Sequence, residues 1–417
     1  MINVAEEYNY IERAVLVTIK FPALSFDEIN EHLDELELLA ETAGANTIAK
    51  FIQSLDKPNP ATYIGKGKLY EIQQFVEEND IDLIIFDEEL TPTQTRNLQN
   101  ILNRKVIDRT SLILSIFAKH AKTKEAKLQV ELAQSTYMLS RLTRLWTHLS
   151  KQYGGIGTKG PGETQLETDR RILKDRIALL KEKIQKIETE HKTKSSNRSE
   201  IFKCSLVGYT NAGKSTIMNL LTNANVLAED KLFATLDSTT RYCKFENKEF
   251  LLSDTVGFIR KLPHNLIASF RSTLKEVELA DLILIVIDIS HPFFEDHIKV
   301  VLDTLKELNC DKKDKLFVLN KFDVLKDKNK IEEIIVKYPQ SVIISAKEKL
   351  NINQLLNKIK ESIEKQSKIY QLRINAGNGK LLSKIYNLCD VKSVNYDGDT
   401  VIIDFVCSEE VFNTLSK

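Results

Sequence analysis

The chain has 417 residues, of which 42% are hydrophobic and 28% are charged, and its formal net charge is zero. This composition is ordinary for a globular protein, and the length allows two to four domains with hydrophobic cores. The longest apolar run, Leu282 to Ile287, is too short to cross a bilayer, and the five cysteines show no CxxC spacing. We therefore expect no membrane span, no zinc cluster and no disulfide framework.

Residues 1 to 7 include two glutamates and contain no apolar core of the length found in signal peptides. Scattered cysteines also fit a reducing compartment. A cytoplasmic location is therefore predicted, and we expect the chain to be a monomer.

Residues 1–108 are predicted to form a small α/β domain with a mostly parallel sheet. Apolar runs at 14–17 and 83–86 are typical of buried strands, and residues 26–43 place apolar side chains on one helix face. The segment from Tyr63 to Lys68 puts two glycines and two lysines before a helix predicted at 69–78. It is interpreted either as a contact for RNA or a second nucleotide at a helix N-terminus, or as an ordinary tight turn.

Residues 109–193 are predicted to form a basic helical hairpin with a glycine-rich tip. Between positions 109 and 198, 19 Lys and Arg residues stand against 9 Asp and Glu residues, although the whole chain is neutral. Apolar residues recur at helical spacing over 128–149 and 166–187, which is typical of two amphipathic helices. Five of the 14 glycines lie between these stripes, so the two helices are expected to pack antiparallel.

The tip of this hairpin is predicted to contact RNA, because lysine and arginine bind phosphates and glycine lets the backbone approach closely. The alternative is a solvated loop whose glycines only reverse the chain. Base identity is expected to matter little, since contacts to phosphates carry no sequence information. The candidate RNA-binding residues are Lys151, Gly154, Gly155, Gly157, Lys159, Gly160 and Gly162.

After a polar linker at 194–199, residues 200–367 are predicted to form a doubly wound α/β domain around a phosphate-binding loop. The sequence GxxxxGKS stands between an apolar run and a helical pattern. Its backbone N–H groups are expected to face phosphate, with Lys214 reaching the β- and γ-phosphates and Ser215 binding Mg²⁺. The candidate residues of this loop are Gly208, Tyr209, Thr210, Asn211, Ala212, Gly213, Lys214, Ser215 and Thr216.

Three short motifs follow, each at the end of an apolar run. In Asp254-Thr255-Val256-Gly257, the aspartate is expected to hold Mg²⁺ through water and the glycine N–H to meet the γ-phosphate. The carboxylate of Asn320-Lys321-Phe322-Asp323 is expected to accept from the N1–H and amine of guanine, a donor pair that adenine lacks. The backbone of Ser345-Ala346-Lys347 is expected to meet guanine O6. In this order the motifs predict GTP rather than ATP.

A mobile loop is expected between the phosphate-binding loop and Asp254, and it should carry a threonine that completes the Mg²⁺ shell. The segment 232–241 contains Thr235, Thr239 and Thr240, and the hydroxyl groups alone do not distinguish them.

Four segments together resemble the HflX family of ribosome-associated GTPases: 208–216, 233–237, 254–259 and the glycine-rich 157–171. The resemblance extends over about residues 10 to 365, and the glycine-rich segment separates the family from its Obg-type relatives. It implies that Thr235 is the second Mg²⁺ ligand beside Ser215. The candidate catalytic residues are Lys214, Thr235 and Gly257. It also implies the large ribosomal subunit as partner, with hydrolysis linked to the splitting or rescue of stalled ribosomes. The residues carried over in the mobile loop are Phe233, Ala234, Thr235, Leu236 and Asp237.

Phe258 stands where Ras-like GTPases carry the glutamine that orients the attacking water. Because phenylalanine cannot hydrogen-bond water, hydrolysis is expected to rely on backbone atoms of the mobile loop, on a partner or on a monovalent cation. Asn211 is a candidate K⁺ ligand, and its alternative role is to brace the loop. We expect slow intrinsic hydrolysis that ribosomal subunits accelerate and that K⁺ supports better than Na⁺.

Residues 368–417 are predicted to form a small α+β domain built on a hairpin. A helix is expected at 380–388 and strands at 393–396 and 400–405, joined by a turn at Asp397 and Gly398. No motif in this region indicates a chemical role.

The predicted function is that of a GTP hydrolase that binds the large ribosomal subunit through the basic hairpin and uses the nucleotide as a switch. GTP, GDP and Mg²⁺ are the expected ligands, with K⁺ as a further candidate. One alternative is a non-ribosomal GTPase that acts in RNA modification or remodelling. Another is a non-hydrolysing, GTP-dependent scaffold, which Phe258 keeps open.

Overall fold

The computed structural model describes residues 11–149, 161–195, 201–222, 232–233, 238–246, 248–261, 274–325, 328–398 and 400–408, together with 412 and 415. The described residues fall into two compact units. The first comprises those of 1–188 with those of 229–237 and 259–274, and the second comprises the rest. No helix among the described residues is long and apolar enough to span a membrane.

The first unit contains a parallel four-stranded sheet, as predicted, in the order β2-β1-β3-β4. The chain passes from β1 to β2 on one side and then to β3 on the other. The carboxyl ends of β1 and β3 therefore flank a topological switch point, the place where open α/β sheets bind ligands. The strands are β1 (Glu12–Lys20), β2 (Ala45–Ser54), β3 (Leu83–Phe86) and β4 (Lys105–Asp108).

Four helices accompany this sheet, and their ends follow local capping rules. In the first helix the Ser25 side chain and Glu28 form a capping box, and Gly44 ends the helix with a φ of 100°. The helices are α1 (Phe26–Ala43), α2 (Lys66–Glu78), α3 (Pro92–Leu102) and α4 (Arg109–His120). The sequence assigned α4 to the basic hairpin, and α4 packs on α1, β3 and β4 of the α/β domain as well as on α5.

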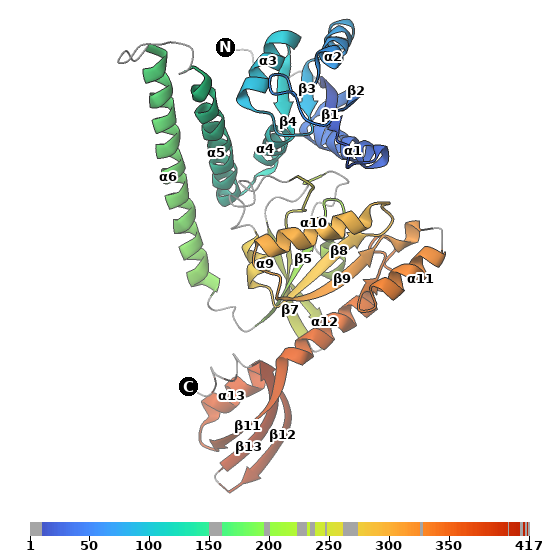
Figure 1. The fold of residues 1–417 in the computed structure, drawn as a ribbon. Coiled ribbons are helices and arrows are strands. Elements are labelled where there is room, and N and C mark those ends of the chain that lie inside the picture. The colour runs from blue at the N-terminus through green and yellow to red at the C-terminus, as the bar shows by residue number, and fades with distance from the viewer. Residues whose placement is uncertain are drawn as a thin grey trace, which may run out of the picture. The chain divides into compact units, whose positions relative to one another are not determined.

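The basic hairpin consists of α5 (Lys124–Leu149) and α6 (Pro161–Ser195), which lie side by side in Figure 1. Their contact is the predicted apolar seam, in which Leu132, Leu180 and Ile184 are buried and Leu128 and Ile177 pack against them. The structure corrects one placement: Gly162 belongs to the first turn of α6 and not to the loop between the helices. The other candidate RNA-binding residues, Lys151 to Gly160, lie outside the described residues.

The second unit contains a six-stranded sheet in the order β10-β9-β8-β5-β7-β6, of which Figure 1 labels β5, β7, β8 and β9. All neighbours are parallel except β6 and β7, so the carboxyl ends of five strands share one edge. The strands are β5 (Phe202–Gly208), β6 (Thr239–Phe245), β7 (Lys248–Asp254), β8 (Leu282–Asp288), β9 (Asp314–Asn320) and β10 (Val342–Ile343).

Helices of this unit cover the sheet and complete its core. Ile217 and Met218 join Leu355 and Ile359 against the buried side chains of the strands. The helices are α7 (Lys214–Thr222), α9 (Lys275–Leu279), α10 (Phe294–Glu307), α11 (Lys328–Lys337) and α12 (Ile352–Gln366), with the 3₁₀ helix η2 (Phe322–Val324).

The C-terminal residues form an antiparallel sheet in the order β11-β13-β12, with α13 packed against it. The predicted helix and hairpin are confirmed, whereas β11 was not predicted. The alternating apolar residues Tyr370, Leu372 and Ile374, which pack in the core of this domain, were a usable signal. The elements are β11 (Ser367–Asn375), α13 (Gly379–Leu388), β12 (Asp390–Asp397) and β13 (Thr400–Ser408).

Candidate functional site

The GxxxxGKS loop connects the carboxyl end of β5 to the first turn of α7. A Cβ on Gly208 would lie 2.2 Å from the carbonyl oxygen of Val286, so only glycine fits at this place, where β5 runs parallel beside β8. Gly213 has a φ of 96° and Asn211 a φ of 59°, which are left-handed conformations. The loop therefore turns back toward its own helix, and its backbone curves around the Lys214 side chain.

Lys214 is buried, and its ammonium group donates to the carbonyls of Gly208 at 3.1 Å and Tyr209 at 2.8 Å. Burial lowers the pKa of Lys214 to about 8, against the opposing effect of the Asp254 carboxylate. An ammonium held inside the loop by two carbonyl groups can turn to an anion at the same place, which is the requirement for binding phosphate.

Ser215 and Asp254 meet beneath this loop, where the Ser215 hydroxyl donates to a carboxylate oxygen of Asp254 at 2.7 Å. Asp254 is the last residue of β7 and is fully buried, and the neighbouring Thr255 hydroxyl donates to the carbonyl of Leu206. A hydroxyl and a carboxylate are hard oxygen donors of the kind that Mg²⁺ prefers, so this pair fits the predicted ion. When bound, Mg²⁺ supplies positive charge to the phosphate oxygens.

Asn320, the last residue of β9, joins three of the predicted motifs. Its amide nitrogen donates to the carbonyl of Ala212 at 2.9 Å, and its amide oxygen accepts from the Ala346 N–H at 3.0 Å. Gly213 lies so close that a Cβ there would be 2.2 Å from the Asn320 nitrogen. The sequence therefore places these motifs correctly at one edge, but it does not reveal that one side chain fastens them together.

The remaining motif residues lie around this junction. Ser345 is buried and its hydroxyl accepts from the Glu348 N–H, whereas Lys347 and Asp323 are exposed at the same edge of the sheet.

Lys321 adopts a φ of 64° and pairs with Asp288 at 2.7 Å. Thr216, Val256 and Phe322 accompany their motifs, in α7, after β7 and in η2, respectively.

Phe258 contacts the phosphate-binding loop through its backbone. Its N–H donates to the carbonyl of Gly208 at 3.0 Å, and its carbonyl accepts from the Thr210 N–H at 2.8 Å. Its side chain is 2% exposed. The preceding Gly257 is equally close: a Cβ there would lie 2.9 Å from Thr210 and 3.0 Å from the Lys214 nitrogen. Residues 257–258, which follow Asp254, are therefore in direct contact with the phosphate-binding loop.

The three threonine candidates are placed differently. Thr235 lies outside the described residues, as do Ala234, Leu236 and Asp237, whereas Phe233 is described. Thr239 pairs with Asp254 in the antiparallel ladder of β6 and β7, and the Thr240 hydroxyl lies 2.8 Å from that of Ser253. Thr239 and Thr240 are thus strand residues, and the role of Thr235 stays a prediction.

Tyr209 and His297 form a contact that sequence reasoning missed. Their rings stack with centroids 3.8 Å apart and an angle of 7° between the planes. His297 comes from α10, so this stack fixes the second residue of the phosphate-binding loop against a distant helix. No spacing in the sequence could have paired these two residues.

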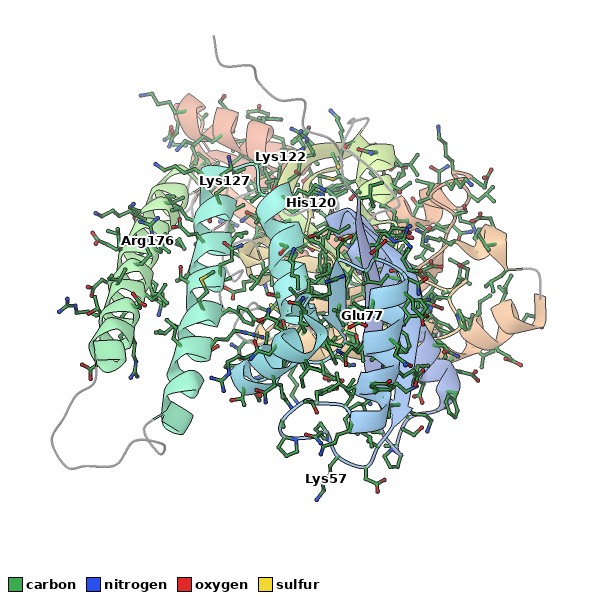
Figure 2. All side chains as sticks on the ribbon, turned by 90° about the horizontal axis from the view of Figure 1, so that it is seen from above. Lys57, Glu77, His120, Lys122, Lys127 and Arg176 are labelled. Carbon is green, nitrogen blue, oxygen red and sulfur yellow. The ribbon has the colours of Figure 1, made fainter. Side chains whose placement is uncertain are left out.

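Exposed cations line the described part of the basic hairpin. Figure 2 shows Lys122 and Lys127 near the start of α5 and Arg176 on α6. Arg176 pairs with Glu131 of the neighbouring helix, while most other cations face solvent. Among the residues of α6 whose burial is described, the exposed cations are Arg170, Arg171, Lys174, Arg176, Lys181, Lys183 and Lys186.

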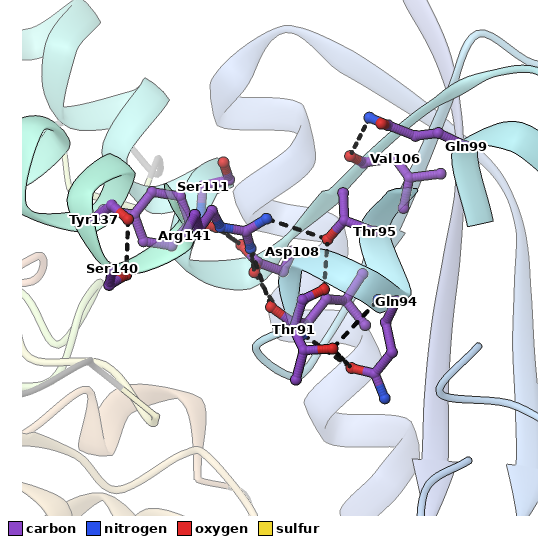
Figure 3. A network of polar contacts seen from close by, with 11 residues as sticks. Thr91, Gln94, Thr95, Gln99, Val106, Asp108, Ser111, Tyr137, Ser140 and Arg141 are labelled. Carbon is purple, nitrogen blue, oxygen red and sulfur yellow. Dashed lines mark hydrogen bonds and ion pairs between the residues drawn. The ribbon is translucent and has the colours of Figure 1, made fainter. Parts of the chain in front are cut away.

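The hairpin is anchored to the α/β sheet through Asp108, as Figure 3 shows. This carboxylate is fully buried at the end of β4, pairs with Arg141 of α5 and accepts from the Tyr137 hydroxyl at 2.7 Å. Arg141 also donates to Thr95 and to the carbonyl of Leu90. A buried carboxylate with these partners holds α5 at a fixed place on its domain.

Comparison with known proteins gives matches along most of the chain. Family models described as GTP-binding GTPase N-terminal, GTP-binding GTPase Middle Region and 50S ribosome-binding GTPase match residues 30–118, 120–198 and 203–321. A relative called GTPase HflX from Flavobacterium psychrophilum is 52% identical over 76% of this chain and 76% of its own length. Another of that name, from Magnetococcus marinus, is 42% identical over 96% of this chain and 94% of its own.

Among solved structures, a GTP-binding protein from the archaeon Sulfolobus solfataricus in complex with GDP is 26% identical to this chain. The match covers 84% of this chain and 98% of that one, with a TM-score of 0.46.

Proposed function

The chain belongs to the HflX family of GTPases, and from this membership and its site we propose that it is a GTP-driven switch acting on the large ribosomal subunit. One observation carries the nucleotide part: the Asn320 side chain bonds both Ala212 and Ala346, so the phosphate-binding and base-binding motifs form one connected site. The ribosomal part is supported by the description of the matching family model and by the exposed cations of the hairpin.

In the proposed site, Lys214 and the loop N–H groups bind the β- and γ-phosphates, and Asp323 accepts from guanine. Ser215 and Asp254 hold Mg²⁺, with Thr235 completing the protein ligands. The Gly257 N–H meets the γ-phosphate, since Gly257 already lies against Thr210 and Lys214. Hydrogen-bond donors fixed around the phosphates stabilise the charge that develops in the transition state.

The attacking water of GTP hydrolysis is oriented by groups other than Phe258, because the Phe258 side chain is apolar and buried. We therefore propose slow intrinsic turnover that the ribosome accelerates. Asn211 remains the proposed K⁺ ligand, because its left-handed backbone places an exposed amide at the turn of the loop. Turnover in K⁺ and in Na⁺ at equal ionic strength tests this role.

The hairpin is proposed to bind ribosomal RNA through phosphate contacts, and GTP binding and hydrolysis to serve the splitting or rescue of stalled ribosomes in the cytoplasm. The anchoring of α5 at Asp108 supports this role, because a hairpin fixed on its α/β domain can transmit a displacement between its tip and that domain.

The test is GTP turnover measured with the protein alone, with total RNA stripped of protein, and with purified large subunits. We expect a low rate alone, little change with free RNA and an increase of at least about tenfold with large subunits, as for other GTPases completed by a partner. Acceleration by free RNA alone would instead support a role in RNA modification or remodelling.

A further inference from the structure

Two segments from the GTPase part of the sequence fold with the N-terminal α/β unit. Among the described residues, Phe233, Arg260 and Lys261 are grouped with that unit, whereas Gly257 and Phe258 belong to the other. Phe233 and Ile259 are only 3% and 2% exposed. The segment after Asp254 therefore leaves the nucleotide site and, within three residues of Phe258, becomes part of the N-terminal unit.

Charged and aromatic contacts hold these segments. Lys261 pairs with the carboxylates of Asp87 and Glu88, the latter at 2.7 Å. Arg260 pairs with Glu31 of α1, and the ring of Phe233 packs edge-on against Phe117 of α4 at 4.7 Å. Lys261 and Phe233 both have positive φ values, 55° and 56°, so the backbone accepts an unfavourable conformation where these side chains dock.

Asp87 follows β3 directly, at the switch point between β1 and β3, and its N–H donates to the carbonyl of Val17. It is fully buried and also pairs with Arg109 at 2.8 Å. Burial alone would raise the pKa of Asp87, but Arg109 and then Lys261 outweigh burial and hold this pKa below its ordinary value. A negative charge at this place suits a cation and repels phosphate.

We expect a displacement of Gly257 at the γ-phosphate site to affect the ion pairs of Lys261 with Asp87 and Glu88. Gly257 lies against Lys214 and Thr210, so a phosphoryl group that binds the Lys214 ammonium and the Gly257 N–H has to separate them. The next residue, Phe258, can move with Gly257 only if its two backbone hydrogen bonds to Gly208 and Thr210 break or if the loop moves with it. Only three residues connect Gly257 to Lys261. Because this segment is short, a displacement of Gly257 should also displace Lys261.

We propose that Asp87 and Glu88 form a binding site for the Lys261 side chain, and that GTP, unlike GDP, withdraws Lys261 from it. This ion pair and the Phe233 contact let the N-terminal unit sense the nucleotide. The proposal rests on the GTPase site but not on the ribosome as partner.

The first test compares the binding of a non-hydrolysable GTP analogue and of GDP to full-length wild type and to Lys261→Met. Methionine keeps an apolar stem and removes the charge. We expect the variant to bind the analogue about fivefold more tightly, because a partly exposed ion pair no longer opposes the change, while GDP affinity stays within about twofold. Lys299→Met, at an exposed position on α10, is the matched control and should change neither.

The second test follows His32, whose pKa is lowered by burial and then by Arg260 and Lys261. NMR titration of full-length protein, with the His32 signal assigned through His32→Gln, should show this pKa rising by about one unit with the GTP analogue and staying unchanged with GDP. In Lys261→Met it should be raised without nucleotide.

Unchanged or weaker analogue binding by Lys261→Met, or a His32 pKa that is insensitive to the analogue, would overturn the proposed docking of Lys261. Failure of wild type to bind any guanine nucleotide would instead overturn the nucleotide site itself. The two failures are therefore distinguishable.

Discussion

His32 is a residue at which acid should weaken the protein. It lies on α1 and is 6% exposed, and burial together with Arg260 and Lys261 lowers its pKa to about 4, while Asp87 and Glu31 act in the opposite direction. The folded protein therefore keeps His32 neutral at a pH where the unfolded chain, with an ordinary pKa of about 6.5, takes up a proton. Stability from this residue is complete above pH 6.5 and is lost as the pH falls toward 4.

Between pH 7 and pH 5 this linkage should lower the free energy of unfolding by about 2 kcal/mol. Thermal unfolding of full-length protein at the two pH values checks it, because the carboxylates contribute mainly at lower pH. His32→Gln should lose most of the difference that wild type shows. Equal pH dependence of the two proteins would mean that His32 is not neutral in the fold.

The positions of the candidate nucleotide-site residues on the fold followed from the sequence, whereas most of their contact partners did not. The spacing of Lys214, Asp254 and Asn320 relative to apolar runs was enough to place them at one sheet edge. Partners such as His297 for Tyr209, or Asp87 for Lys261, come from elements far away in the chain. Local pattern carries no information about such pairings, because they depend on how the layers pack.

At the scale of elements, α5 is the helix whose position should depend on one buried charge. Arg141 neutralises Asp108, which is fully buried, whereas Arg141 itself is about one-fifth exposed. Arg141→Met should therefore cost about 2–3 kcal/mol, somewhat less than breaking a completely buried pair. Urea unfolding combined with hydrogen exchange of α5 measures this loss, and exchange should rise in α5 before it rises in β1.

Arg176→Met is the matched control, since it removes an arginine from α6 whose pair with Glu131 is exposed. It should cost less than about 1 kcal/mol. If both variants lost the same stability, Asp108 would not be the anchor of the hairpin.

Helix α4 is an element whose domain could not be predicted from the sequence. Its first half is buried on several sides, including Thr110, Leu112, Ile113 and Leu114, so it lacks the polar face that would have separated it from the hairpin. The amphipathic stripes of α5 and α6, in contrast, predicted their mutual packing correctly. Periodicity identifies a helix that faces one neighbour but not a helix enclosed by a domain.

For the whole molecule, the order of segments along the chain does not determine which segments fold together. Residues on both sides of β6 and β7, at 232–233 and 259–261, join the N-terminal unit although the intervening strands do not. Nothing in their composition marks this exchange. It became visible only through the buried contacts of Phe233 and Lys261.

The segregation of charge, 19 basic against 9 acidic residues over 109–198 in a neutral chain, leads to the last prediction. Replacing Lys151 and Lys159 together with glutamate should weaken binding to large subunits at least about tenfold, and should reduce the slope of log affinity against log salt by about 2, one unit for each lost phosphate contact. GTP affinity should not change. Filter binding over a salt series measures both quantities.

Lys57→Glu combined with Lys299→Glu is the matched control, because it makes the same change in net charge at exposed positions outside the hairpin. If charge alone governed binding, the two double variants would lose affinity equally. A specific hairpin contact requires a larger loss for the first, and nucleotide control requires that loss to be greater with a GTP analogue than with GDP. Equal affinity of wild type for large subunits in both nucleotide states would contradict the switch, since a ligand shifts an equilibrium only through its different affinity for the two states.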